Sequence, residues 1–211
     1  MSKFVLLLGG SLLVTERVRQ LVAGARVLAA DGGIAHAAAL GLEPELWLGD
    51  FDSASPELEE RYAHVPRKVF PAAKDMTDGE LALNEAYRLG ATEVILCGAF
   101  GGDRTDHTLL HLTMATAHAA QGRKLVLCSG TEEAHPLVAG KHGFDFADGT
   151  LFSIVAFSQL HGLFIEGARW PLENVELSFG SSLTVSNAVC GNLHVSLNSG
   201  KAILIAAPQT A

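Results

Sequence analysis

The chain has 211 residues, of which 48% are hydrophobic and 18% are charged, and its formal net charge is −8. This length allows one large domain or two small ones with a buried core, and the composition is not that of a disordered chain. The acidic balance argues against nucleic acid as a partner. It leaves room for a small polyanionic substrate if a metal ion and local basic groups offset the charge.

Cysteine usage and the amino terminus bear on location. Cys97, Cys128 and Cys190 lack the C-x-x-C spacing of metal sites and lie in or beside apolar runs, which predicts reduced, buried thiols. The apolar run at residues 4–8 resembles the start of a secretion signal, but two glycines and then charged residues follow it, which favours a first core strand. No run has the length of a membrane span. We therefore expect a soluble cytoplasmic protein without a membrane partner.

The first ~130 residues alternate between short apolar runs and helical stretches, which is typical of βα units. Ser55-Pro56-Glu57 supplies an N-cap, a proline at the first helical position and an acidic first turn, and Thr77-x-x-Glu80 is a capping box. The pattern predicts a doubly wound, mostly parallel α/β domain. We expect strands at residues 4–8, 27–30, 46–48, 68–70, 93–97 and 125–128, and helices near residues 15–23, 34–40, 56–62, 78–89 and 106–120.

The second part of the chain has a different character. No amphipathic helix is evident there, and short β-prone runs are separated by Gly, Asn and Ser, which predicts an antiparallel β-sandwich or jelly roll. The boundary is expected between Ser129 and Gly149, giving domains of residues 1–135 and 136–211. The expected strands are residues 150–157, 174–179, 182–185, 192–197 and 202–206.

Five aspartates stand in short Gly-rich or Thr-rich stretches, each directly after a predicted strand. The carboxyl ends of parallel strands share one edge of a sheet, where ligands bind, so these side chains are expected to converge on one acidic pocket. Carboxylates repel one another, and a divalent cation is the commonest reason for gathering them. The five are Asp50, Asp52, Asp75, Asp78 and Asp106.

Two of these stretches end the second and third predicted strands. The glycines of Asp31-Gly32-Gly33 would let a phosphate or nucleotide approach the backbone, but the same tripeptide is also an ordinary turn. In extended backbone Asp50 and Asp52 point the same way, which suits magnesium. The alternative is a solvated turn in which Ser53 or Asp52 caps the next helix.

The stretch Lys74-Asp75-Met76-Thr77-Asp78 opens a predicted helix. Thr77 and Asp78 are good capping residues, and capping alone accounts for them. The functional interpretation makes Asp75 or Asp78 a further metal ligand, or the base for an attacking hydroxyl group, with Lys74 as a point charge for a phosphate.

The stretch of residues 98–107 is the most specific one. Its glycines, Gly101 and Gly102 among them, can present backbone N–H groups to phosphates, and Arg104 can hold two phosphate oxygens with its planar fork. Asp106 is either a helix cap or a metal-facing carboxylate, and His107 either bonds substrate or fixes the loop. A zinc site on His107 and His111 is a weaker alternative, because no Glu stands between them and no third ligand is placed.

In the second half, Trp170 could stack on a flat cationic or aromatic ligand, although a tryptophan in a β domain is more often core. Ser186-Asn187 could equally be an ordinary turn. The chain contains no Walker phosphate loop, no dinucleotide glycine fingerprint and no Gly-x-Ser-x-Gly turn, which weakens the usual nucleotide-hydrolysing and nicotinamide-dependent classes.

Taken in order, these motifs resemble the thiamine pyrophosphokinase (thiamine diphosphokinase) family over nearly the whole chain. The resemblance implies an α/β ATP-binding catalytic domain, a flattened β-sandwich that binds thiamine, and a homodimer with sites at the subunit interface. The implied reaction transfers pyrophosphate from ATP to the hydroxyethyl group of thiamine, giving thiamine diphosphate and AMP. Alternatives are a pyrophosphokinase for a related heterocycle such as a pterin, and a non-catalytic nucleotide or thiamine sensor.

The resemblance also implies roles for individual residues. Magnesium is expected on Asp50 and Asp52, with Asp75 or Asp78, and one of the last two is the candidate base. Two departures from the family's motif put contacts in doubt: Asp103 is inserted before Arg104, and His111 stands where Asn is common. Arg104 and Asp106 join the catalytic group; the expected nucleotide contacts are Asp31, Gly32, Gly33, Ser53, Lys74, Thr77, Gly101, Gly102 and His107, and the expected thiamine contacts are Trp170, Ser186 and Asn187.

Overall fold

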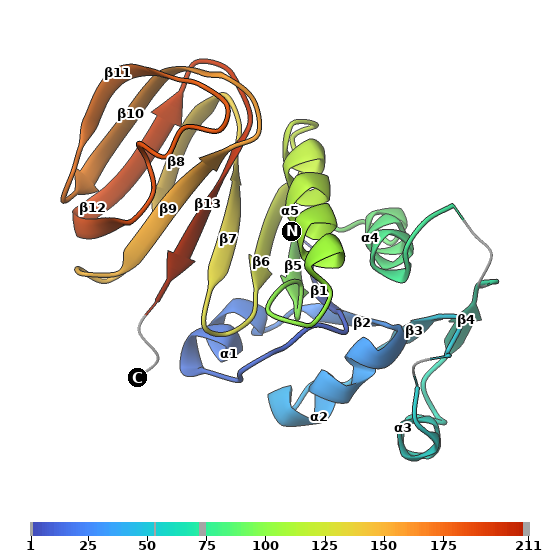
Figure 1. Cartoon of the computed structure of the whole chain (residues 1–211). Helices are drawn as coiled ribbons and strands as arrows, with labels where there is room; N and C mark the ends of the chain where they lie inside the picture. The colour runs from blue at the N-terminus through green and yellow to red at the C-terminus, as the bar shows by residue number, and fades with distance from the viewer. Residues whose placement is uncertain (1, 53, 72–74, 209–211) are drawn as a thin grey trace. The chain divides into compact units, whose positions relative to one another are not determined.

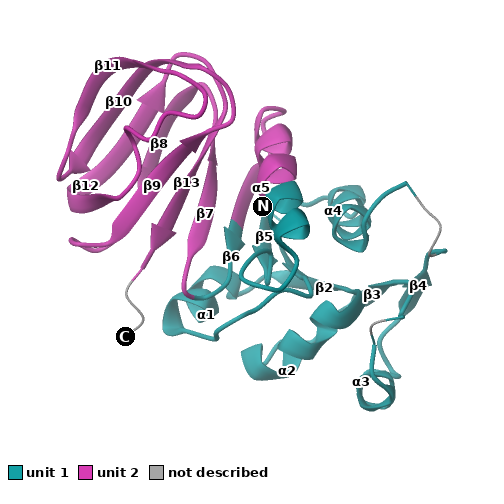
Figure 2. Cartoon of the chain, in the orientation of Figure 1, with its two compact units in different colours: residues 1–111, 127–130 teal, residues 112–126, 131–211 magenta. Residues whose placement is uncertain are grey.

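The structure, a computed structural model, describes residues 2–52, 54–71 and 75–208. The chain divides into two compact units (Figure 2). Unit 1 comprises residues 1–111 and 127–130, and unit 2 comprises residues 112–126 and 131–211. Among the described residues, no helix combines the length and apolar character needed to cross a membrane.

Unit 1 is built on a parallel sheet with the strand order β4-β3-β2-β1-β5 (Figure 1). The central strands carry continuous apolar runs because both of their faces are buried; residues 4–7 of β1, for example, are fully buried. The end of β6 belongs to this unit, where Gly98 donates its N–H to the Cys128 carbonyl at 2.9 Å. The strands are β1 (Lys3–Leu7), β2 (Arg26–Ala30), β3 (Leu46–Gly49), β4 (Arg67–Val69), β5 (Glu93–Cys97) and β6 (Lys124–Cys128).

Side-chain caps begin three of the helices. The hydroxyl oxygens of Thr15, Ser55 and Thr77 each accept the backbone N–H three residues further on, which satisfies a donor that has no partner within the helix. Helix α4 packs its small and apolar face, with Ala82, Leu83 and Ala86, against β1, β2 and β3. The helices are α1 (Glu16–Val22), the 3₁₀ turn η1 (Asp31–Ala35), α2 (His36–Leu40), α3 (Pro56–Arg61), α4 (Asp78–Arg88) and α5 (Thr105–Ala119).

Unit 2 is β-rich, and the strand pairings within it are antiparallel in the order β11-β10-β12-β9-β13-β7, with β8 also paired to β12. Strand β12 pairs with β9 at residues 187–188, with β8 at residues 193–197, and with β10 at residues 189 and 194–196. Ile165 and Val195 face each other across β10 and β12 in a buried apolar cluster. The strands are β7 (Glu133–Leu137), β8 (Gly140–Phe144), β9 (Leu151–Ala156), β10 (Leu160–Ala168), β11 (Leu172–Leu177), β12 (Asn187–Leu197) and β13 (Ala202–Ala207).

The structure confirms an α/β half followed by a β-rich half, and it confirms each strand and helix predicted in the first half to within a few residues. The doubly wound and jelly-roll descriptions stay predictions. The strand predicted at residues 182–185 is wrong: this stretch is a turn, in which the Ser181 hydroxyl accepts the Leu183 N–H at 3.3 Å. Strands β7, β8 and β10 were not predicted from the sequence; they contain a proline or glycines at Pro136, Gly143, Gly162 and Gly167.

Candidate active site

A pocket of about 400 Å³ lies at the carboxyl edge of the unit 1 sheet. Its walls come from the segments that follow β1, β2 and β5 and from the first turns of α4 and α5. This volume is within the range of small-molecule sites, and the carboxyl edge is where open α/β sheets bind ligands. Distant loops therefore converge at this edge, as the sequence predicts, but of the five predicted aspartates only Asp78 lines the pocket.

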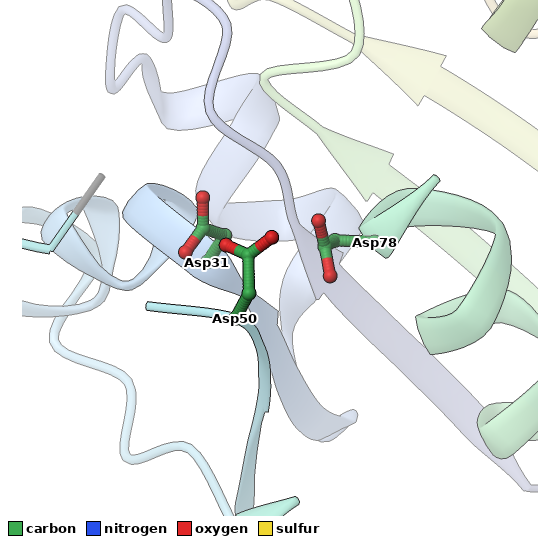
Figure 3. A group of neighbouring side chains, drawn as sticks. All are labelled: Asp31, Asp50 and Asp78. Carbon is green, nitrogen blue, oxygen red and sulfur yellow. The ribbon is translucent and has the colours of Figure 1, made fainter. Parts of the chain in front are cut away.

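Three carboxylates meet beside this pocket. Asp31 follows β2, Asp50 follows β3 and Asp78 opens α4, and one oxygen of each lies within 4.8 Å of the others. Figure 3 shows the three carboxylates turned toward one another. All three residues are half-buried, and no other group of three or more potential metal ligands is found in the described part of the chain. Carboxylate oxygens are the ligands that Mg²⁺ and Ca²⁺ prefer, so this group fits a hard divalent cation.

Unusual backbone conformations bring Asp31 and Asp50 together. Asp31 has φ 47° and Phe51 has φ 65°, a left-handed conformation that is uncommon for residues other than glycine. Gly49, at φ 151°, passes so close to Asp31 that a Cβ added to it would lie 3.2 Å from the Asp31 Cβ. The positive φ and the close contact both favour glycine at this position, and Asp50 follows it with its carboxylate next to that of Asp31.

Asp52 and Asp75 lie outside this three-carboxylate group. Asp52 is exposed, and its backbone N–H donates to the Asp50 Oδ1 at 3.3 Å. The negative charge of Asp50, followed by that of Asp31, raises the pKa of the Asp52 carboxyl, so this side chain feels the acidic group. Asp75 is exposed. Ser53 and Lys74 lie outside the described residues.

The start of α4 serves two purposes at once. Thr77 is its N-cap, and its hydroxyl accepts the Glu80 N–H at 3.3 Å, as the capping interpretation predicts. Asp78 is the first residue of the helix, and both it and Thr77 line the pocket. The capping and acidic-site interpretations therefore do not exclude each other.

The glycine-rich loop after β5 contributes Gly102, Asp103 and Arg104 to the pocket wall. Gly101 has φ 84°, which favours glycine there. The Arg104 guanidinium holds Asp106 in a two-pronged ion pair, with Nε–Oδ1 at 2.9 Å and Nη2–Oδ2 at 2.7 Å. This pair lowers the pKa of Asp106 well below its usual range. A phosphate on Arg104 would have to share or replace Asp106.

His107 and His111 also line the pocket, with ring centroids 6.2 Å apart. His111 is only 6% exposed and its Nδ1–H donates to the Ala99 carbonyl at 2.7 Å. Burial lowers the pKa of His111, which favours the neutral ring, and with Nδ1 as the donor the neutral ring has Nε2 as an acceptor. That Nε2 lies beside Gly79, where an added Cβ would be 3.1 Å away.

Some glycines of the pocket were not assigned a site role from the sequence, among them Gly9 and Gly10. Gly9 and Gly10 follow β1, and the His36 Nε2–H donates to the Gly10 carbonyl at 2.8 Å. The usable signal was a Gly-Gly pair at the carboxyl end of a strand, the same signal that singled out Gly32 and Gly33. Gly32 lines the pocket, whereas Gly33 is buried against β1, where an added Cβ would lie 2.2 Å from the Leu7 carbonyl oxygen.

The predicted thiamine residues lie together in unit 2. Trp170 is 54% exposed, so its interpretation as a core residue is wrong. The buried Asn187 accepts the Trp170 N–H at 3.1 Å and donates its amide to the Trp170 carbonyl at 2.8 Å, which fixes the backbone that carries the indole. Ser186 is exposed, with φ 63°, and its N–H donates to the Ser153 hydroxyl at 3.0 Å.

Comparison with known proteins gives two adjacent family matches. Residues 18–127 match the thiamin pyrophosphokinase catalytic domain, and residues 141–202 match the thiamin pyrophosphokinase vitamin B1 binding domain. A curated thiamine pyrophosphokinase from Bacillus subtilis is 28% identical over 151 residues, which is 70% of each chain.

Solved structures of similar proteins share the fold. Thiamine pyrophosphokinase from Bacillus subtilis superposes with a TM-score of 0.87 at 22% identity, covering 99% of this chain and 100% of the other. The enzyme from Geobacillus thermodenitrificans gives a TM-score of 0.82 at 25% identity, covering 100% and 99%. Thiamin pyrophosphokinase from Candida albicans gives 0.81 at 13% identity, covering 99% and 89%. The catalytic-domain match alone spans more than half of the chain, and the chain therefore belongs to the thiamin pyrophosphokinase family.

Proposed function

We propose that the chain is a thiamine diphosphokinase, which transfers pyrophosphate from ATP to the hydroxyethyl group of thiamine and releases AMP. The observation that carries this proposal is the group of Asp31, Asp50 and Asp78 at the mouth of a pocket inside the catalytic-domain match. Three carboxylates within 4.8 Å repel one another, and binding a nucleotide without catalysis does not require them.

The two parts of the chain divide the substrates between them. Residues 1–135 form the ATP-binding catalytic domain and residues 136–211 the thiamine-binding domain, a division supported by the gap between the two family matches. The triphosphate lies along the glycine-rich segments after β1, β2 and β5. Successive backbone N–H groups in such segments can bind an anion. Arg104, in the loop before α5, and His107, in the first turn of α5, contact the triphosphate.

The residues present fit Mg²⁺, because the ligand atoms are carboxylate oxygens that converge from three segments. Asp31, Asp50 and Asp78 would hold the ion, and the exposed Asp52 and Asp75 extend the acidic surface toward it. When bound, Mg²⁺ would neutralise charge on the phosphate oxygens.

The reaction breaks one bond and forms one. The hydroxyl oxygen of thiamine attacks the β-phosphorus of ATP in line, the bond from that phosphorus to the oxygen shared with the α-phosphate breaks, and AMP leaves with that oxygen. Asp75 or Asp78 accepts the hydroxyl proton. The Arg104 guanidinium offsets charge that develops on the transferred group, so the protein contributes mainly positioning and electrostatics.

Thiamine binds to unit 2 through the exposed face of Trp170. An indole ring attracts a flat cation such as the thiazolium of thiamine, and Asn187 keeps the Trp170 backbone in place. Ser186 hydrogen-bonds the aminopyrimidine. The homodimer and the cytoplasmic location stay predictions.

One assay tests the activity. Purified protein is incubated with ATP, MgCl₂ and either thiamine or a pterin alcohol, and AMP is followed by a coupled enzyme reaction. We expect AMP release with thiamine and none with the pterin alcohol. Release with the pterin alcohol alone would assign the heterocycle alternative, and ligand binding without AMP would assign a sensor.

A further inference from the structure

One buried side chain contacts both of the backbone segments that carry Asp31 and Asp50. Trp47, on β3, is fully buried, and its indole N–H donates to the Asp31 carbonyl at 2.8 Å. The edge of the Phe51 ring meets the same indole, with centroids 4.8 Å apart and planes at 80°. Phe51 stands directly between Asp50 and Asp52, so both contacts of Trp47 fall on residues at the acidic group.

Both of these partners have left-handed backbone. Asp31 (φ 47°) and Phe51 (φ 65°) are non-glycine residues in a conformation that persists only where surrounding contacts enforce it. The Trp47 hydrogen bond ends on the Asp31 carbonyl itself, and the Trp47 ring packs on the Phe51 side chain. Without these contacts each segment would relax toward common backbone angles and turn its carboxylate away.

Trp47 is itself held firmly. The backbone N–H of Trp47 donates to the Pro66 carbonyl at 2.9 Å, and Trp47 is paired with Arg67 in the register of β3 and β4. The Arg67 guanidinium lies 4.7 Å from the centroid of the indole and 5.2 Å from that of the Phe51 ring, and it also pairs with Glu59 at 3.1 Å. The position of the indole is therefore fixed by β3 and β4, and the indole in turn contacts the two segments that carry Asp31 and Asp50.

We infer that Trp47 is a positioning residue for the cation: its indole N–H and ring hold Asp31 and the Asp50–Asp52 segment at the spacing that a divalent ion requires. This inference rests on the proposed function, since it takes the three carboxylates as the cation site. Residues that orient metal ligands without touching the metal typically contribute 10–100-fold in metal affinity. The indole N–H acts through the backbone carbonyl of Asp31, and the indole ring acts through Phe51, the residue after Asp50.

The test is direct cation binding by calorimetry, with MnCl₂ and MgCl₂ and no nucleotide. Trp47→Phe removes the N–H but keeps an aromatic ring, and we expect its dissociation constant to rise at least about tenfold. Phe51→Leu keeps the indole and removes the ring contact, and we expect a rise of several-fold. Trp170→Phe is the matched control, because it removes the other indole of a chain with two tryptophans, and its affinity is expected to stay unchanged.

Thermal unfolding is recorded for each variant, so that a loss of fold is separated from a loss of affinity. If Trp47→Phe does not fold, Phe51→Leu carries the calorimetric test. In addition, Trp47 is the sole tryptophan of the Trp170→Phe variant, and Mn²⁺ should change its fluorescence.

Folded Trp47→Phe or Phe51→Leu protein with wild-type cation affinity would overturn the role of Trp47 while leaving the proposed function intact. A wild-type protein that binds no cation would overturn the role of Trp47 and the cation site, whereas AMP release with thiamine tests the proposed function separately. Excess MgCl₂ should restore AMP release by Trp47→Phe, since the carboxylates themselves remain.

Discussion

Each of the three carboxylate residues at the pocket is positioned by a different local interaction. The Asp31 carbonyl accepts the Trp47 indole N–H, and Asp78 opens a helix that Thr77 caps. Asp50 follows Gly49, where an added Cβ would lie 3.2 Å from the Asp31 Cβ. The Asp50 Oδ1 also accepts the Asp52 backbone N–H at 3.3 Å. A change from carboxylate to amide alters charge and ligand quality, but the amide oxygen of an asparagine can still accept such an N–H.

The acidic group is the first target for mutation. Asp78→Asn and Asp52→Asn should each abolish turnover, with kcat/KM falling by about a hundredfold or more, because the first removes a ligand of the cation and the second removes a negative charge that attracts it. Coupled AMP release measures the effect, and far-UV circular dichroism should show an unchanged fold. Full activity in both variants would refute the metal-site assignment.

His111 offers a second test in the same pocket. It is buried, and its Nδ1–H satisfies the Ala99 carbonyl in the wall. His111→Leu should lower the free energy of unfolding by about 1–3 kcal/mol and raise the KM for ATP, because a buried carbonyl loses its donor. His111→Gln retains a donor, so its free energy of unfolding should fall less and its KM for ATP should rise less. Equal losses in the two variants would show that the hydrogen bond is not the cause.

Asp31 shows what sequence spacing conveys and what it leaves open. The Asp-Gly-Gly motif after a strand indicated a ligand-facing turn, and Asp31 does line the pocket. Its meeting with Asp50 depends on the parallel pairing of β2 with β3 and on the left-handed φ of Asp31, and neither is encoded in a local motif. Proximity of this kind comes from tertiary structure.

Among the elements, α4 is joined to the edge strand β4 by a buried acid. Glu85 on α4 is 6% exposed and bonds the Lys68 Nζ of β4 at 2.8 Å and the Arg88 guanidinium at 2.6 Å. The Arg88 hydrogen bond and then Lys68 outweigh burial and lower the Glu85 pKa to about 2. Since α4 begins with Thr77 and Asp78, this contact also supports the position of the site.

The lowered pKa of Glu85 predicts how stability depends on pH. A depressed carboxyl pKa stabilises the fold fully above the unfolded value of about 4.3, and that contribution is lost as the pH falls toward 2. Glu85→Gln should therefore lower the free energy of unfolding at pH 7 by about 1–3 kcal/mol and flatten its decline between pH 5 and pH 2. Urea denaturation at a series of pH values measures both effects.

The matched control is Glu60→Gln on α3, an exposed acid for which little change is expected at any pH. If Glu85→Gln and wild-type protein lose stability in parallel below pH 5, the ion pair does not contribute as the structure indicates.

Elements were predictable where local signals agree. Capping residues located α3 and α4, apolar periodicity also supported α4, and continuous apolar runs located the parallel strands. Strands β7 and β8 were not predicted because Pro136 and the sequence Gly-Lys-His-Gly-Phe lower the β propensity of these stretches. Antiparallel pairing within unit 2 overrides that low propensity.

On the scale of the whole molecule, the two family matches place a catalytic domain and a vitamin B1 binding domain one after the other along the chain. Trp170 tests this division. Trp170→Ala should raise the KM for thiamine roughly tenfold, as expected for losing about 1–2 kcal/mol of cation–π attraction, and should leave the KM for ATP nearly unchanged. Steady-state kinetics with each substrate varied in turn measures both constants.

Phe179→Ala is the control, because Phe179 is an aromatic residue of unit 2 that is 71% exposed and has no proposed role. A similar rise in the thiamine KM for both variants, or a larger effect on ATP than on thiamine, would contradict the assignment of Trp170.

The most direct measurement is anomalous diffraction from crystals grown with MnCl₂ and a non-hydrolysable ATP analogue. We predict a manganese peak between the carboxylates of Asp31, Asp50 and Asp78, at about 2.0–2.2 Å from their oxygens and in contact with phosphate oxygens of the analogue. Bound analogue with no peak at these three side chains, or a peak only at His107 and His111, would contradict the account.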